Sequence, residues 1–127
     1  MIQKKNPANT LEPKPINSDD TQPSLWELVI KDFEFGFLGN QNYKNGILEL
    51  MNARNIFGIE KYGVPLKINN GRSFINDSLQ ENLDILPYLK GILCKEKQPY
   101  KRWLIEEAYR SAQESIILLY EYFLMEA

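Results

Sequence analysis

Hydrophobic residues recur every three or four positions along most of the chain from Ser24 onward, which is the spacing of one face of an α-helix. Ser24-Leu25-Trp26-Glu27 forms a capping box, in which the serine caps the first turn and the glutamate reaches back. This first helix is predicted to end near Gly36. Residues 36–46 contain three glycines among amide and lysine side chains, so they are predicted to form a loop.

A second helix is predicted over residues 47–61. Gly63 stands where a left-handed cap ends a helix, and Pro65 prevents the helix from resuming. The Asn-Gly pair at 70–71 favours a turn. A β-hairpin at this pair stays open as an alternative, although neither flank alternates convincingly between apolar and polar residues.

The third helix is predicted to begin near Ser73 and to be kinked or restarted at Pro87, because proline lacks the backbone N–H of a helical hydrogen bond. Its predicted inward side chains are Phe74, Leu79, Leu83, Leu86 and Leu89. After a charged turn at residues 95–99, a last helix is predicted over residues 100–125. Its apolar stripe comprises Trp103, Leu104, Ala108, Ala112, Ile116, Leu119, Tyr120 and Phe123.

These elements together predict an all-α fold, a helical bundle of about four helices. Residues 1–23 hold four prolines and few large apolar side chains, so they are predicted to be a disordered N-terminal tail. The chain has 127 residues, which suits one domain. Residues 24–127 are therefore predicted to form a single all-α domain.

Charge and composition exclude several classes of function. The net charge of −2 argues against a nucleic-acid partner, and no stretch is long and apolar enough to suggest a membrane partner. The single cysteine, Cys94, cannot form an internal disulfide, which favours a reducing, cytoplasmic location. The chain has no histidine, so a Ser-His-Asp triad, a Cys-His pair and a His-ligated zinc site are excluded. Any metal would be held by oxygen atoms, which favours Mg²⁺, with Mn²⁺ as a second option.

The candidate chemistry lies in three acids of the third helix, Asp77, Glu81 and Asp84. Steps of four and seven residues place them within an arc of roughly 60° on one helix face. Carboxylates at such short separations repel one another unless a cation lies between them, so this row of acids is a candidate metal site. The alternative is a solvated acidic face, which many helices have.

Basic and small residues gather just upstream of this row, as a phosphate-binding segment requires. They are Arg54, Lys61, Gly63, Lys67, Gly71 and Arg72. The alternative interpretation is a solvated loop whose charges are incidental.

Several motifs in this part of the chain occur in the order and spacing of one known family. The run ARNIFGIEKYGVPL at 53–66 is followed by NGR at 70–72 and then by an acidic motif with Asp77, Gln80-Glu81, Asp84 and Tyr88-Leu89. With LWELVIKD at 25–32, the chain resembles the MazG-like nucleotide pyrophosphohydrolases of phages and bacteria over residues 24–90.

The resemblance implies an all-α nucleoside triphosphate pyrophosphohydrolase fold that binds magnesium through an ExxE and an ExxD motif. Such enzymes cleave between the α- and β-phosphates of a nucleoside triphosphate and are dimers or larger homo-oligomers. Glu81 and Asp84 match the ExxD motif, and Asp77 is the expected third metal ligand. Glu49 is the expected further catalytic acid, which would bind a second metal or orient the attacking water.

For this reaction, a substrate-binding set is hypothesised in the upstream segment. Lys61, Arg72 and Arg54 would contact phosphate oxygens, and Tyr62 would either stack on the base or cap its helix. The predicted substrate-binding residues are Arg54, Lys61, Tyr62, Lys67, Asn70 and Arg72.

The ExxE half of the family pattern is incomplete, because the segment that starts at Glu49 ends in Asn52. Two alternatives to an active enzyme therefore stay open. One is a catalytically silent helical module that binds a nucleotide or a protein. The other is a structural helical protein of a phage particle, which would bind neither metal nor nucleotide.

Overall fold

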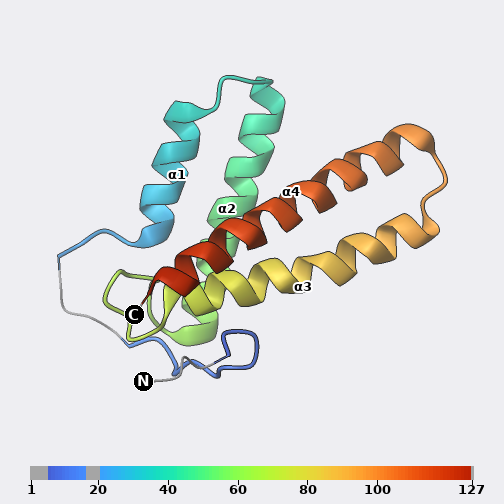
Figure 1. Ribbon diagram of the computed structural model, residues 1–127. Coiled ribbons are helices and arrows are strands. Elements are labelled where there is room, and N and C mark those ends of the chain that lie inside the picture. The colour runs from blue at the N-terminus through green and yellow to red at the C-terminus, as the bar shows by residue number, and fades with distance from the viewer. Residues whose placement is uncertain (1–5, 17–20, 127) are drawn as a thin grey trace. The chain divides into compact units, whose positions relative to one another are not determined.

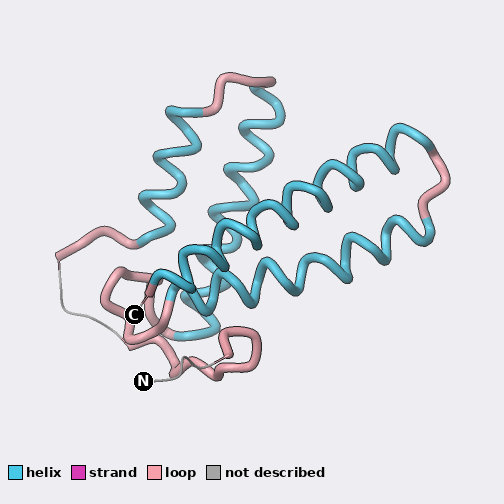
Figure 2. The backbone as a smooth tube through the Cα atoms, viewed as in Figure 1, coloured by secondary structure: helices cyan, strands magenta, loops and turns pink. Residues whose placement is uncertain are grey.

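The computed structural model describes residues 6–16 and 21–126. It contains four α-helices joined by short loops (Figure 1), namely α1 Leu25–Gly36, α2 Gln41–Tyr62, α3 Phe74–Lys95 and α4 Pro99–Met125. No strand occurs in this part of the chain (Figure 2), so the predicted all-α class is confirmed and the alternative hairpin at 70–71 is not formed.

The chain divides into two compact units. One unit pairs α1 with α2 and lies within Pro13–Arg72. The other pairs α3 with α4 and combines Ser73–Ala127 with the described part of Met1–Glu12. Each unit is thus a helical hairpin, with one helix packed against its neighbour along the chain.

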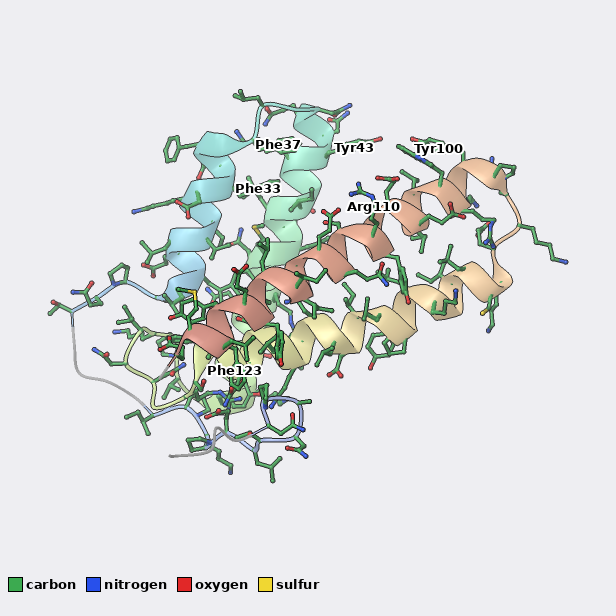
Figure 3. The ribbon with its side chains drawn as sticks, viewed as in Figure 1. Phe33, Phe37, Tyr43, Tyr100, Arg110 and Phe123 are labelled. Atoms are coloured by element: carbon green, nitrogen blue, oxygen red, sulfur yellow. The ribbon has the colours of Figure 1, made fainter. Side chains whose placement is uncertain are left out.

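In the first unit, α1 begins where the capping sequence predicts. The Ser24 hydroxyl accepts a hydrogen bond from the backbone N–H of Glu27 at 3.2 Å. The adjacent Leu25 N–H donates to the Leu66 carbonyl at 2.7 Å, which fixes the start of α1 to the segment after α2. At the other end, the rings of Phe33 and Phe37 stack with centroids 5.0 Å apart (Figure 3).

The predicted loop at 36–46 is too long, and the start predicted for the second helix is too late. The helix begins at Gln41, because the Asn40 carboxamide oxygen accepts from the N–H groups of Asn42 and Tyr43 and caps it. Gly46 then lies inside α2, where a glycine costs only about 1 kcal/mol relative to alanine. The cap that Asn40 provides therefore favours a helix start at Gln41 more than the nearby glycines disfavour it.

The end of α2 and the following turn agree with the prediction. Gly63 is the C-cap in the left-handed region, with φ of 76°, and its N–H donates to the Ile59 carbonyl at 2.7 Å. Gly71 also has a positive φ of 79° in the turn before α3. Both positions suit glycine, which has no Cβ to clash in this conformation.

In the second unit, Ser73 caps α3 and Gln98 caps α4, which carries Pro99 in its first turn. The α3 helix runs without interruption through Pro87, so the predicted restart at that residue does not occur. Between the helices, the Arg102 guanidinium donates to the carbonyls of Leu93 and Glu96, which closes the turn.

The hydrophobic core of the described residues is small. Its buried apolar side chains are Leu79, Leu89, Leu93 and Ala112, all in the α3–α4 unit. Of the predicted inward side chains of α3, Leu79 and Leu89 are buried and Leu86 is half-buried, whereas Phe74 and Leu83 are exposed. The predicted stripe of α4 is only partly buried: Ala112 is in the core, whereas Trp103 is 51% and Tyr120 is 52% exposed. A helix packed against one neighbour covers a narrower strip than a helix inside a bundle.

The N-terminal leader is placed over residues 6–16, where it forms no helix or strand. A backbone hydrogen bond joins its second half to the rest of the α1–α2 unit, because the Ile16 N–H donates to the Asn70 carbonyl at 2.9 Å. Residues 1–5 and 17–20 of the predicted disordered tail lie outside the described residues.

Candidate functional site

The acidic row lies on the first half of α3, as the helical spacing predicts. Asp77 is in the first turn and is half-buried, whereas Glu81 and Asp84 are exposed. The latter two line an open hollow of about 370 Å³. Its other lining residues are Asn82, Ile85 and Tyr88. The hollow therefore combines two carboxylates with a phenol ring and an aliphatic side chain.

The three predicted metal ligands do not close into one group. In residues 6–16 and 21–126, no set of three or more Asp, Glu, Cys or His side chains is placed to hold a metal ion. Magnesium is nevertheless often held by one or two carboxylates, with water and substrate phosphates as the remaining ligands. Glu81 and Asp84, which share the hollow, fit that donor set as a pair.

The two basic residues of α2 that are predicted to bind phosphate, Arg54 and Lys61, are exposed, and each contacts an aromatic ring of the same helix. The Arg54 guanidinium lies 4.7 Å from the centroid of the Phe57 ring, and the Lys61 ammonium lies 5.2 Å from that of Tyr62. Each contact is between near neighbours along the helix and is weak at an exposed site. Glu49, the predicted further acid, is also an exposed residue of α2.

The remaining substrate-binding candidates lie in the segment between α2 and α3. Asn70 is buried at 1% exposure, and its carboxamide oxygen accepts from the Arg72 N–H at 3.0 Å. The Arg72 guanidinium donates to the Pro13 carbonyl at 2.6 Å. Lys67 is half-buried. Asn70 and Arg72 thus both contribute to holding the turn and the leader.

The structure therefore gathers the three acids on one helix, and two of them in one hollow, within the α3–α4 unit. The other predicted site residues belong to the α1–α2 unit. They are Glu49, Arg54, Lys61, Tyr62, Lys67, Asn70 and Arg72. Their assignment to substrate binding or catalysis stays a prediction.

Three residues next to the acidic row were not predicted to have a role. Glu12, Asn76 and Gln80 join the leader to α3 through side-chain hydrogen bonds. A signal for Asn76 was present in the sequence, because Ser73 opens a capping box that has this asparagine where a glutamate or glutamine is usual. No local pattern identifies the distant residue that fills this gap.

Two side chains of α4 have a shifted pKa. Arg110 is exposed on α4 (Figure 3). A hydrogen bond to Glu107 and its charge, followed by those of Glu114, raise the pKa of Arg110. A hydrogen bond to the Glu126 carboxylate, followed by its charge, raises the pKa of Tyr122. Tyr122 and Glu126 also border a second open hollow, of about 500 Å³, which contains none of the predicted site residues.

Comparison with known proteins gives no family to this chain. No protein-family model, no curated protein and no solved structure matches it. Within the part of the chain that the structure covers, none of the helices has the length and apolar character needed to cross a bilayer.

Proposed function

We propose that this protein is a magnesium-dependent pyrophosphohydrolase that converts a (deoxy)nucleoside triphosphate into a monophosphate and pyrophosphate. The observation that carries the proposal is the hollow on α3 in which Glu81 and Asp84 lie with Tyr88. The similarity of residues 24–90 to the MazG-like pattern supports the same reaction. Mn²⁺ would serve as an alternative metal, because it also prefers oxygen ligands.

The three acids of α3 would hold the metal ion in this reaction. Glu81 and Asp84, with Asp77 one turn earlier, would hold magnesium, which when bound supplies positive charge against the triphosphate. A further acid and the substrate contacts are predicted in the α1–α2 unit, and each of these roles stays a separate prediction. They are Glu49 as the acid and Arg54, Lys61, Tyr62, Lys67, Asn70 and Arg72 as the contacts.

The decisive substitution is Glu81→Gln, which keeps the size of the side chain and removes its charge. We expect it to lower pyrophosphate release by at least about a hundredfold, since a charged metal ligand is lost. Release would be measured with each common nucleoside and deoxynucleoside triphosphate in the presence of Mg²⁺. Far-UV circular dichroism would show that the helices remain.

The matched control is Glu121→Gln on α4, which removes an exposed carboxylate outside the hollow. It should leave the rate unchanged. An equal loss in both variants, or full activity in Glu81→Gln, would rule out the assigned role of Glu81.

A second candidate is a catalytically silent helical module that binds a nucleotide or a protein. It is favoured by Asn52, which stands where the ExxE motif has its second acid. Isothermal titration with the same nucleotides, beside the pyrophosphate assay, separates the two candidates. Binding without product favours the module.

We further propose that copies of the chain associate into a homodimer or a larger homo-oligomer. The end of α4 supports this, because several of its large apolar side chains are more than half exposed. They are Ile117, Leu118, Tyr120, Tyr122, Leu124 and Met125. A cytoplasmic location, in a bacterial cell or a phage-infected host, fits the single cysteine and a nucleotide substrate.

A further inference from the structure

The first half of the leader is bound to α3 across more than 60 residues of sequence. The Gln80 side-chain amide donates to two leader carbonyls, that of Pro7 at 2.8 Å and that of Thr10 at 2.7 Å. The Glu12 carboxylate accepts from the Ser73 backbone N–H at 3.2 Å and from the Asn76 side-chain amide at 2.8 Å. Four hydrogen bonds thus hold residues 6–12 on one helix.

This part of the leader is itself folded into a turn. The Ala8 N–H donates to the side-chain oxygen of Asn6 at 2.9 Å, and the Thr10 hydroxyl donates to the Asn6 carbonyl. Such local bonds reduce the number of conformations that the segment loses when it docks. The docked segment is therefore held by local hydrogen bonds of its own as well as by those to α3.

Glu12 fills a specific vacancy in the cap of α3. The Ser73 hydroxyl accepts from the Asn76 N–H at 3.3 Å, which is the first half of a capping box. In the complete box, a glutamate or glutamine at the position of Asn76 accepts from the N–H of the capping residue. Here Asn76 instead donates to Glu12, and the Glu12 carboxylate takes the Ser73 N–H.

The docking face and the acidic row are neighbours on the same turns of α3. Ser73, Asn76 and Gln80 follow the three- and four-residue spacing of one stripe. Asp77 and Glu81 each follow a member of this stripe by one residue, or about 100° around the helix. Asp77 lies in the first turn of α3, which the leader caps. Any ordering of this turn by the leader therefore also orders the backbone of Asp77.

We propose that residues 6–12 are a detachable strap that completes the capping box of α3 through Glu12 and so controls the order of the turn that carries Asp77. When the strap is docked, this turn is held. When it is released, the Ser73 N–H and the Asn76 side chain lose their carboxylate partner and the turn frays. Where the strap concerns metal or nucleotide binding, the inference rests on the proposed function.

The test is residue-resolved amide exchange by NMR in the full chain. In Glu12→Ala, the amides of residues 73–77 should exchange roughly tenfold faster, the effect of losing hydrogen bonds to a charged group. The amides of Leu89 and Leu93 should not change. Lys14→Ala, which removes an exposed leader side chain, is the control and should match the unchanged protein. Exchange at 73–77 within twofold of the unchanged protein in Glu12→Ala overturns the proposal.

A rescue variant separates capping from general damage. Asn76→Glu places the usual glutamate at the third position of the box, within α3 itself. In this background Glu12→Ala should leave the exchange of residues 73–77 slow, while the amides of Ala8 and Asn9 become mobile by heteronuclear relaxation. Fast exchange at 73–77 in the double variant would contradict a capping role for Glu12.

Magnesium-dependent nucleotide binding, measured by titration in the same variants, links the strap to the acidic row. Glu12→Ala should weaken binding about threefold or more, and Asn76→Glu should restore it. Equal binding in the unchanged protein and Glu12→Ala overturns the link to the row. If the unchanged protein binds no nucleotide, the proposed function fails, whereas the exchange data still decide whether the strap caps α3.

Discussion

At the scale of single residues, two glycines of α2 and its C-cap have opposite effects on stability. Gly63 ends α2 with a φ of 76°, a conformation that other residues adopt at a cost of about 1–2 kcal/mol. Gly58 lies inside α2, where the missing Cβ only adds backbone freedom to the unfolded chain. At both positions the space around an added Cβ is open, so neither effect is confused with a steric clash.

Alanine at these two positions should therefore shift stability in opposite directions. We expect Gly63→Ala to lower the free energy of unfolding by about 1 kcal/mol and Gly58→Ala to raise it by about 0.5–1 kcal/mol. Urea unfolding followed by circular dichroism would measure both. A gain in stability for Gly63→Ala would show that the left-handed cap does not form in solution.

At the scale of elements, α3 contains a proline in its interior, and its N-terminal cap is completed by Glu12 from a distant part of the chain. Pro87 lies inside the helix and cannot donate a hydrogen bond to the preceding turn, yet the helix continues on both sides. Packing of Leu79, Leu89 and Leu93 on either side of the proline supports this continuity. Pro99 is different, because the first turn of α4 has free N–H groups in any case.

The two prolines offer a matched comparison. Pro87→Ala should restore a helical hydrogen bond and raise the free energy of unfolding by about 1–3 kcal/mol. Pro99→Ala should change it by less than about 0.5 kcal/mol, since the N–H that it restores has no helical partner. Thermal unfolding would measure both variants. Destabilisation by Pro87→Ala would mean that the α3–α4 packing requires a bend at that residue.

At the scale of the whole molecule, the chain consists of two helical hairpins with few buried apolar side chains. In the α3–α4 unit, the apolar residues that α3 does not cover stay exposed along α4. Leu118 is 68% exposed and Met125 is 78% exposed. Association between copies would remove such surface from water, which is favourable by about 25 cal/mol per Å² of apolar area.

A charge in this surface should weaken self-association. We expect Leu118→Glu to raise the dissociation constant by at least about tenfold, because an unpaired carboxylate in an interface is costly. Gln113→Glu adds the same charge at an exposed polar position of α4 and is the control. Sedimentation velocity over a range of concentrations would compare the two. A chain that is monomeric at every concentration would exclude the proposed oligomer.

Most of the fold could be predicted from local sequence, because helix ends depend on nearby groups. Ser24, Gly63 and Ser73 end or begin their helices where predicted, each through a bond or conformation within a few residues. The start of α2 was missed because the Asn40 cap was overlooked among glycines. The positions of the candidate acids on α3 could also be predicted, since they require only helical spacing.

The all-α class, the caps at Ser24, Gly63 and Ser73 and the shared helix face of Asp77, Glu81 and Asp84 follow from interactions within one or two turns, so they can be read from the chain alone. Burial of particular apolar residues and completion of the cap of α3 depend instead on contacts between distant segments. Glu12 lies 61 positions before Ser73, and that pairing depends on how the chain folds back on itself. The spacing of residues near Ser73 does not predict this contact, because it forms only when the folded chain brings the Glu12 carboxylate to the Ser73 N–H.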